Sequence, residues 1–355
     1  MKVLTVLGAR PEFIQWAPVT RALRRRHQEV VVHTGQHFDP NMSDVFFQEL
    51  DLPAPDHHLG VHGGAHGEQT GRMLIELEKV MQREAPDWVV LFGDTNSTLA
   101  AALCAAKQQR PVAHIEAGLR SYDRAMPEEV NRVLVDHVST LLLCPTERAV
   151  SQLAAEGITL GVHLVGDVRV DLVPQVLKLA RSKIGRLRKE AGIGESEPFV
   201  FSTIHRASNT DSSERLEKVL GALAQVPLPV VLPVHPRLKC RMKDFRLKFP
   251  GSVRAIDPVS FLETTALLDA SKYVVTDSGG LQKEAYLLSK QTITLRDTTE
   301  WAETITAGYN RLTEPDSEPF LAALTAAERV VSRHPDLYGS PGVCERIALL
   351  LEQRP

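Results

Sequence analysis

The chain has few cysteines, and their spacing suggests neither a disulfide framework nor a metal site. Its four cysteines lie far apart without a CxxC pair, and the 355 residues contain no DxD or HxH pattern. Cys104 and Cys144 lie within apolar runs, where we expect reduced core residues, as in a cytoplasmic protein. We therefore expect no bound metal.

Long apolar runs and an excess of charge are also missing. No stretch approaches the length of a transmembrane helix, and the apolar start of the chain, residues 1–8, is too short for a signal peptide and indicates a strand. Lys and Arg number 41 against 44 Asp and Glu, which gives a net charge of −3. Without a basic field, neither nucleic acid nor a membrane surface is an expected partner. These features predict a soluble, cytoplasmic protein.

Strand-like and helical patterns alternate from one end of the chain to the other. This alternation is typical of α/β proteins, in which parallel sheets carry helices on both faces. A length of 355 residues favours two domains. The polar helical segment 175–192 and the run that follows it indicate a linker region, so we expect two Rossmann-like lobes, residues 1–168 and 169–337. Strands are expected at residues 3–7, 29–34, 88–92, 111–115, 141–144, 161–168, 199–203, 229–233, 273–276 and 291–295.

The second half contains a pattern that suits a nucleotide diphosphate. An apolar run at residues 273–276 ends in Asp277, Ser278, Gly279 and Gly280, and a helical pattern follows at once. A helix N-terminus without bulky side chains offers unpaired N–H groups and a positive dipole end to a phosphate. Glu284, one turn into that helix, is a good acceptor for two ribose hydroxyls. The alternative is an ordinary strand–helix junction with a serine cap.

Other expected strands of the first half also end in polar clusters. Arg10 follows the first strand in a turn that lacks GxGxxG, which argues against a dinucleotide cofactor. Asp94 and Glu116 follow the strands at 88–92 and 111–115, and Glu128 begins a helical pattern. Taken alone, Asp94 fits a helix cap and Glu128 a solvated first-turn acid. Together they predict a carboxylate cluster whose members raise one another's pKa, as an acid/base site requires.

Histidines and an arginine recur at the strand ends of the second half. His205 and His235 follow two of its strands, and Arg296 follows the strand at 291–295. A lone histidine such as His205 is more often structural than catalytic. Two further histidine pairs, at 57/58 and 62/66, occur in a glycine-rich segment, where we expect solvated side chains and no metal.

Taken together, these clusters resemble the non-hydrolysing UDP-N-acetylglucosamine 2-epimerases along nearly the whole chain. The resemblance rests on GARPE at 8–12, TGQH at 34–37, GDT at 93–95, HIEAGLRS at 114–121, PEEVNR at 127–132, HR at 205–206, PVHP at 233–236, DSGGLQKEA at 277–285 and LRDTTE at 295–300. It implies a glycosyltransferase-B-like pair of lobes with a ligand cleft between them. It also implies that residues 338–355 return to the first lobe, and that the protein is a homodimer.

The resemblance implies inversion at C2 of a UDP-amino sugar, with no cofactor. UDP leaves as the C2 proton is removed, and it then re-adds to an enzyme-bound 2-acetamidoglucal. The implied catalytic residues are Asp94, Glu116, Glu128 and His205. The implied substrate-binding residues are Arg10, Gln15, Arg132, His235, Ser278, Gly279, Gly280, Glu284 and Arg296.

Departures from the family pattern leave the sugar open. The family usually has lysine where Gln15 stands, and Glu-Arg-Pro-Glu where residues 300–303 read EWAE. The segments 41–44 and 296–301 are similar to a sister branch that epimerises UDP-2,3-diacetamido-2,3-dideoxyglucuronate. Further alternatives are a two-lobed glycosyltransferase, a hydrolysing epimerase and a UDP-sugar-binding regulator without activity.

Overall fold

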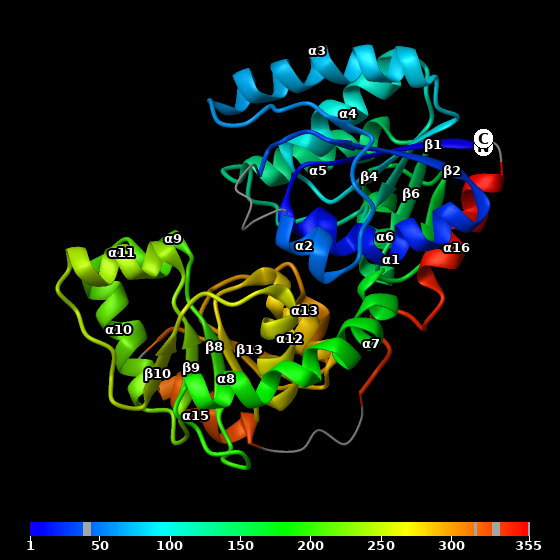
Figure 1. Ribbon diagram of the computed structural model, residues 1–355. Helices are drawn as coiled ribbons and strands as arrows, with labels where there is room; N and C mark the ends of the chain where they lie inside the picture. Colours follow the sequence, from blue (N-terminus) through cyan, green and yellow to red (C-terminus); the bar gives the residue numbers. More distant parts are fainter. Residues whose placement is uncertain (38–43, 316–317, 329–333, 354–355) are drawn as a thin grey trace. The chain divides into compact units, whose positions relative to one another are not determined.

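The structure is a computed structural model that describes residues 1–37, 44–315, 318–328 and 334–353. The chain forms two compact units, Met1–Leu172 with Tyr338–Pro355, and Val173–Leu337 (Figure 1). Helix α7, Arg169–Ala180, begins in the first unit and its chain continues into the second. Residues 41–43, part of one segment used for the resemblance, lie outside the described ranges.

The first unit is built on a seven-stranded sheet in which the paired strands are parallel. The strand order is β3-β2-β1-β4-β5-β6-β7. The strands are β1 Lys2–Leu7, β2 Gln28–His33, β3 His57–His58, β4 Trp88–Phe92, β5 Val112–Ile115, β6 Leu141–Cys144 and β7 Val162–Leu164. The helices are α1 Arg10–Arg26, α2 Asp44–Glu49, α3 His66–Glu84, α4 Asn96–Lys107, α5 Pro127–Val138, α6 Glu147–Ala155 and α16 Val343–Glu352.

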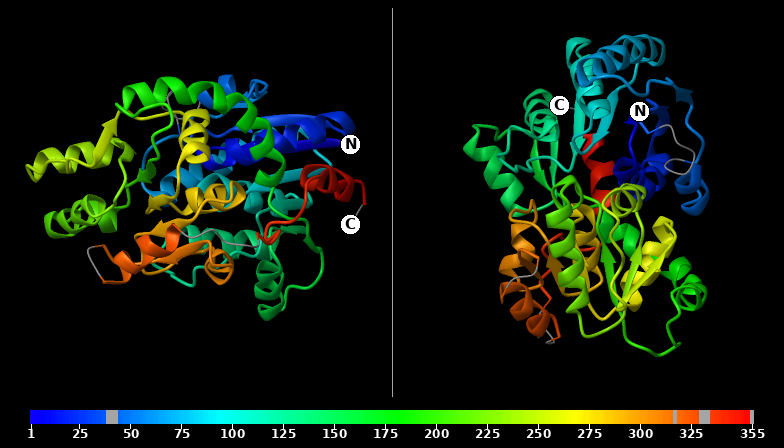
Figure 2. Two further views of the ribbon diagram at one scale, coloured as in Figure 1. Left: turned by 90° about the horizontal axis from the view of Figure 1, so that it is seen from below. Right: turned by 90° about the vertical axis from the view of Figure 1, so that its left-hand side faces the viewer.

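The last helix belongs to the first unit, although it follows the second in sequence. The red α16 lies beside the blue α1 in all views (Figures 1 and 2). The His27 ring hydrogen-bonds the Ala348 carbonyl at 3.0 Å, and Arg26 pairs with Glu345 at 2.7 Å and with Glu352 at 3.1 Å. These contacts fasten the end of the chain to the start of the first unit.

The second unit repeats the architecture with a six-stranded parallel sheet, in the order β10-β9-β8-β11-β12-β13. Its strands are β8 Val200–Thr203, β9 Val230–Pro233, β10 Val253–Ile256, β11 Val274–Thr276, β12 Thr292–Thr294 and β13 Asn310–Leu312. After the 3-10 turn Arg181–Lys183, its helices are α8 Ile184–Glu190, α9 Ala207–Thr210, α10 Ser213–Ala224, α11 Pro236–Asp244, α12 Phe261–Ala270, α13 Gly279–Leu287, α14 Ala302–Thr306 and α15 Glu318–Ala327. Neighbouring residues Val200 and Phe201 pack into two different cores, as a strand buried on both faces requires. The predicted α/β class with parallel sheets is confirmed.

Strand register brings the predicted site residues to common sheet edges. In the first unit Phe92 of β4 pairs with Ile115 of β5, so the residues after both strands emerge side by side. In the second unit Thr203 of β8 pairs with Thr276 of β11 in the same way. Each sheet reverses its strand order next to these strands, between β1 and β4 and between β8 and β11. Open parallel sheets bind ligands at such switch points.

Two local expectations are wrong. The strand expected at 161–168 ends at Leu164, because Gly166 turns the chain with φ +93° where the returning segment crosses it. A Cβ on Gly166 would lie 2.6 Å from the Tyr338 carbonyl oxygen, so only glycine fits there. The expected solvated loop at His57 is instead strand β3, and the His57 ring bonds Glu84 at 2.9 Å.

Candidate active site

Asp94 is held by an arginine rather than by the helix that follows it. Its carboxylate forms an ion pair with Arg132 on α5. The N-cap of α4 is Thr95, whose hydroxyl oxygen accepts from the Thr98 N–H at 3.3 Å. The reading of Asp94 as a helix cap is therefore wrong, and its side chain, 31% exposed, is available at the sheet edge.

The surroundings of Asp94 raise the pKa of its carboxyl group. Its pKa is raised, chiefly because burial disfavours the charged form, and the negative charges of Glu116 and Glu128 add to the effect. Arg132 opposes the rise. Glu128 itself is exposed on the first turn of α5. The structure thus brings Glu116 and Glu128 close enough to influence the carboxyl group of Asp94.

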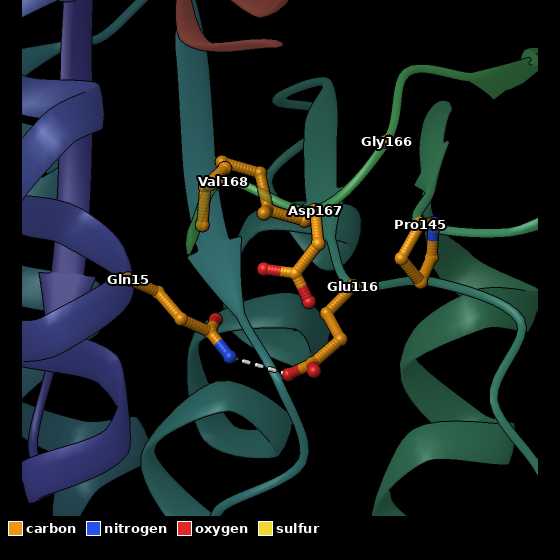
Figure 3. Close-up of a pocket in the computed structure, with 7 residues that line it drawn as sticks. Gln15, Glu116, Pro145, Gly166, Asp167 and Val168 are labelled. Carbon is orange, nitrogen blue, oxygen red and sulfur yellow. Dashed lines mark hydrogen bonds between the residues drawn. The ribbon is translucent and has the colours of Figure 1, made fainter. Parts of the chain in front are cut away.

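Glu116 has an unusual backbone conformation and polar neighbours. Its φ is +73°, in the left-handed region that residues other than glycine adopt only at an energetic cost. Such strained residues are concentrated at functional sites. The Gln15 amide of α1 donates a hydrogen bond to its carboxylate, and Arg169 lies 3.7 Å from the other oxygen. Gln15, Glu116 and Asp167 point toward one another (Figure 3). They line a cavity of about 10 Å³, the space of a single water molecule.

A buried histidine supports the turn that presents Asp94. His114 on β5 is 1% exposed, and its ring nitrogens lie 2.7 Å from the Asp136 carboxylate and 2.7 Å from the Gly93 carbonyl oxygen. Both partners are acceptors, and which ring nitrogen donates depends on the tautomer. Asp136 also accepts from Arg120 at 2.7 Å, and these bonds hold the pKa of Asp136 low although burial raises it. This hydrogen-bond network holds Gly93, the residue before Asp94, in place.

In the second unit, α13 begins at the predicted phosphate cradle. Ser278 is its N-cap, and the hydroxyl oxygen accepts from the Leu281 N–H at 3.5 Å. A Cβ on Gly279 would lie 3.6 Å from guanidinium nitrogens of both Arg206 and Arg296, whereas Gly280 faces open space. The Glu300 carboxylate, which pairs with Arg296, would lie 3.5 Å from the same Cβ. A helix N-terminus with guanidinium groups beside it suits an anion.

His205 is oriented by an aspartate that sequence reasoning did not select. Its Nδ1 lies 3.1 Å from the buried carboxylate of Asp277, which also accepts the backbone N–H groups of His205 and Arg206. These bonds keep the pKa of Asp277 low although burial raises it. The His235 ring is 5.4 Å from that of His205. Histidine Nδ1–H donated to a carboxylate fixes the tautomer and leaves Nε2 for a ligand.

The other predicted residues lie near these clusters. Arg10 is the first residue of α1 and is exposed, and its backbone N–H donates to His37 at 3.0 Å. Glu284 is half-buried on α13. Arg296 forms a bidentate pair with Glu300 at 3.1 Å for both bonds. The ribose role of Glu284 stays a prediction, as does the ligand cleft between the lobes.

Sequence reasoning also missed Glu12, which joins two turns of the first unit. The buried Glu12 carboxylate accepts from the Gly8 and Ala9 N–H groups and from the hydroxyls of Thr95 and Thr98. Burial raises its pKa to about 6. Ala9 cannot cap with its side chain, so the sequence shows no capping box here, and the link from Glu12 to the turn beside Asp94 appears only in the structure.

The described ranges contain neither a metal-type cluster nor a membrane-spanning helix. No group of three or more His, Cys, Asp or Glu side chains there is arranged to hold a metal ion. No helix of that part of the chain is long and apolar enough to cross a membrane.

Known proteins with similar sequences and structures agree on one family. The family model for UDP-N-acetylglucosamine 2-epimerase matches residues 21–352. The chain is 44% identical over 357 residues, 98% of both proteins, to the UDP-2,3-diacetamido-2,3-dideoxy-D-glucuronate 2-epimerase of Pseudomonas aeruginosa. It resembles the Methanocaldococcus jannaschii UDP-GlcNAc 2-epimerase in complex with UDP-GlcNAc and UDP, with a TM-score of 0.89 and 41% identity over 99% of both chains. The Neisseria meningitidis UDP-GlcNAc 2-epimerase bound to UDP-GlcNAc gives a TM-score of 0.88 at 30% identity, over 99% of this chain and 100% of that one. This chain belongs to the UDP-N-acetylglucosamine 2-epimerase family.

Proposed function

We propose that this protein interconverts UDP-N-acetylglucosamine and UDP-N-acetylmannosamine without hydrolysing either. The observation that carries the proposal is the convergence of Asp94, Glu116 and Glu128 at one sheet edge, in a chain of the epimerase family. Family membership favours an epimerase over a glycosyltransferase of similar architecture.

The proposed reaction is an elimination followed by an addition. A carboxylate removes the C2 proton, the C2–H electrons form the C1=C2 bond, and the C1–O bond to UDP breaks. UDP then adds back at C1 while C2 receives a proton on the opposite face. Two carboxyl groups with different protonation states meet this requirement, because one accepts a proton and the other donates one.

The second unit supplies the groups that suit the leaving nucleotide. The α13 N-terminus at Ser278, Gly279 and Gly280, with Arg296 beside it, stabilises charge on the departing diphosphate. His205 and His235 flank this position, and Glu284 holds the ribose. On the first unit, Gln15 serves the sugar, and Arg132 completes the charge network around the catalytic carboxylates. Arg10 helps to hold the diphosphate.

Deuterium incorporation tests the mechanism. UDP-N-acetylglucosamine incubated with the protein in heavy water should give the manno epimer with deuterium at C2, observed by proton NMR. Epimer without deuterium would exclude the elimination route. Accumulation of free UDP with N-acetylmannosamine would indicate a hydrolysing epimerase. Stoichiometric UDP release that depends on an added acceptor would indicate a glycosyltransferase, and binding without any turnover a regulator.

Because the Pseudomonas relative is named for a different nucleotide sugar, that sugar should be tested in the same assay. Turnover should be compared side by side for UDP-N-acetylglucosamine and UDP-2,3-diacetamido-2,3-dideoxyglucuronate. A higher kcat/KM for the second would reassign the substrate while leaving the reaction unchanged. We further propose a cytoplasmic homodimer, which light scattering after size-exclusion chromatography and cell fractionation would check.

A further inference from the structure

The Glu116 carboxylate contacts a neutral amide, that of Gln15, and a positively charged guanidinium group, that of Arg169. The Gln15 amide donates to one carboxylate oxygen but carries no charge. The other oxygen lies 3.7 Å from Nη1 of Arg169, and the same nitrogen lies 3.7 Å from the Asp167 carboxylate. Arg169 is the first residue of α7, and its backbone N–H donates to Asp167 at 2.8 Å. A cation on α7 is thus aimed at a carboxylate that follows β5.

Acidic groups lie at the same sheet edge as Glu116. Asp94 and Glu128 are acids whose charges interact across the same sheet edge. Arg132 is engaged with Asp94 and with Glu129, at 3.0 Å from the latter. Asp167 adds a further negative charge on the Arg169 side. Negatively charged neighbours such as Asp167 disfavour ionisation of Glu116, and the positive charge of Arg169 opposes that effect.

Water has little access to this contact, so the charges are weakly screened. The side chains of Arg169 and Glu116 are 6% and 14% exposed. The cavity bordered by Gln15, Glu116 and Asp167 has room for about one water molecule. An opposite charge within about 4–6 Å in such surroundings changes a carboxyl pKa by 1–3 units. The left-handed backbone at Glu116 also needs an external contact to fix where its side chain points.

We propose that Arg169 is a positioning residue that keeps the Glu116 carboxylate ionised and fixed in direction, so that Glu116 is the proton acceptor of the resting enzyme. C2 must receive its proton from another group on the opposite face, and Asp94, at the same sheet edge, is the donor in this assignment. This assignment rests on the proposed epimerase function.

Glu116 can be titrated without measuring turnover. In protein carrying glutamate labelled with carbon-13 at Cδ, the Glu116 resonance is assigned from its absence in Glu116→Gln. We expect Arg169→Met to raise the pKa of Glu116 by about one unit or more relative to the wild-type chain. Arg169→Lys should retain most of the wild-type value. A pKa that differs by less than about 0.3 between wild type and Arg169→Met would overturn the proposal.

A charge rescue separates electrostatics from packing. The double variant Arg169→Met/Gln15→Lys returns a cation to the same carboxylate from α1, and its Glu116 pKa should fall back toward the wild-type value. If Arg169 acts only through packing, a lysine on another helix does not restore the wild-type pKa of Glu116. A double variant that titrates like Arg169→Met would therefore refute the charge assignment.

Kinetics then connect the titration to catalysis. In Arg169→Met the acid limb of the pH profile of kcat/KM should move up by about the change in pKa measured by NMR, and it should move back in the double variant. A changed NMR titration with an unmoved acid limb would refute the catalytic role of Glu116 as acceptor. Absence of epimerisation in the wild-type chain would instead count against the proposed function, because the NMR titration does not depend on turnover.

Discussion

Replacing Glu12 by glutamine tests whether burial of this carboxylate costs the protein stability at neutral pH. Glu12 is 2% exposed and has four hydrogen-bond donors around it, from the Gly8 and Ala9 backbone and from two threonines. A glutamine oxygen can accept the two N–H groups, while its NH₂ donates to hydroxyl oxygens that are able to rotate. The substitution therefore removes the charge and keeps most of the contacts.

The magnitude follows from the pKa. Burial raises the pKa of Glu12 from 4.5 to about 6. The folded protein thus binds this proton more tightly than the unfolded chain, so its stability falls as pH rises from about 4.5 to 6 and the full cost is present above 6. A difference of about 1.5 pKa units corresponds to ~2 kcal/mol. The free energy of unfolding of Glu12→Gln, minus that of wild type, should therefore rise by ~2 kcal/mol from pH 4.5 to pH 7.5.

The assay is urea unfolding at several pH values in a Trp301→Phe background. Tryptophan fluorescence then reports the first unit, which contains Trp16 and Trp88. Taking the difference between variant and wild type cancels the titration of other acids. Glu12→Ala is the matched control, since it should lose the same pH dependence but be less stable at every pH through its missing hydrogen bonds. A difference between Glu12→Gln and wild type that does not change with pH would refute the reasoning.

Three further substitutions have expected outcomes. Asp94→Asn should lower turnover about 10²–10⁴-fold while leaving UDP affinity by calorimetry nearly intact, and lost UDP binding would contradict its acid/base role. Asp277→Asn places an amide NH₂ against backbone N–H groups and should both destabilise the second unit by about 1–3 kcal/mol and release His205, seen as altered histidine NMR signals. Gly118→Ala should destabilise the first unit by about 1–3 kcal/mol in urea unfolding, because φ is +80° and a Cβ would lie 2.5 Å from a carbonyl oxygen; an unchanged midpoint would contradict this.

The sequence predicted the sheet strands well where apolar runs were buried on both faces. The strand at 141–144 was predicted with its observed bounds, and the one at 88–92 likewise. Short elements with little apolar periodicity were missed, including β10 at Val253–Ile256 and the basic helix α11 at Pro236–Asp244. The sequence does mark the start of α11, because His235 caps it and Pro236 is its first residue. The helix is mostly polar, so it lacks the apolar periodicity from which helices were predicted.

The candidate site was predictable as far as strand ends determine it. Asp94 and Glu116 meet because parallel strands place their carboxyl ends on one edge, which needs only strand positions. Arg169 was not predictable in this way, because it reaches Glu116 from a loop and helix that follow a chain reversal at Gly166. Asp277 was visible in the motif, but its bond to His205 depends on the register of β8 and β11.

The two units use the same sheet edge for opposite electrostatics. On the first sheet, acids follow β4 and β5, and the pKa of Asp94 is raised by burial and by the acids around it. On the second, a helix N-terminus with Arg206 and Arg296 follows β11 and β12. A carboxylate beside the diphosphate would weaken its binding, and a guanidinium group beside Asp94 already works against a proton there. Two sheets of one topology thus present different groups at the same edge: acids after β4 and β5 on the first, and a helix N-terminus with nearby guanidinium groups on the second.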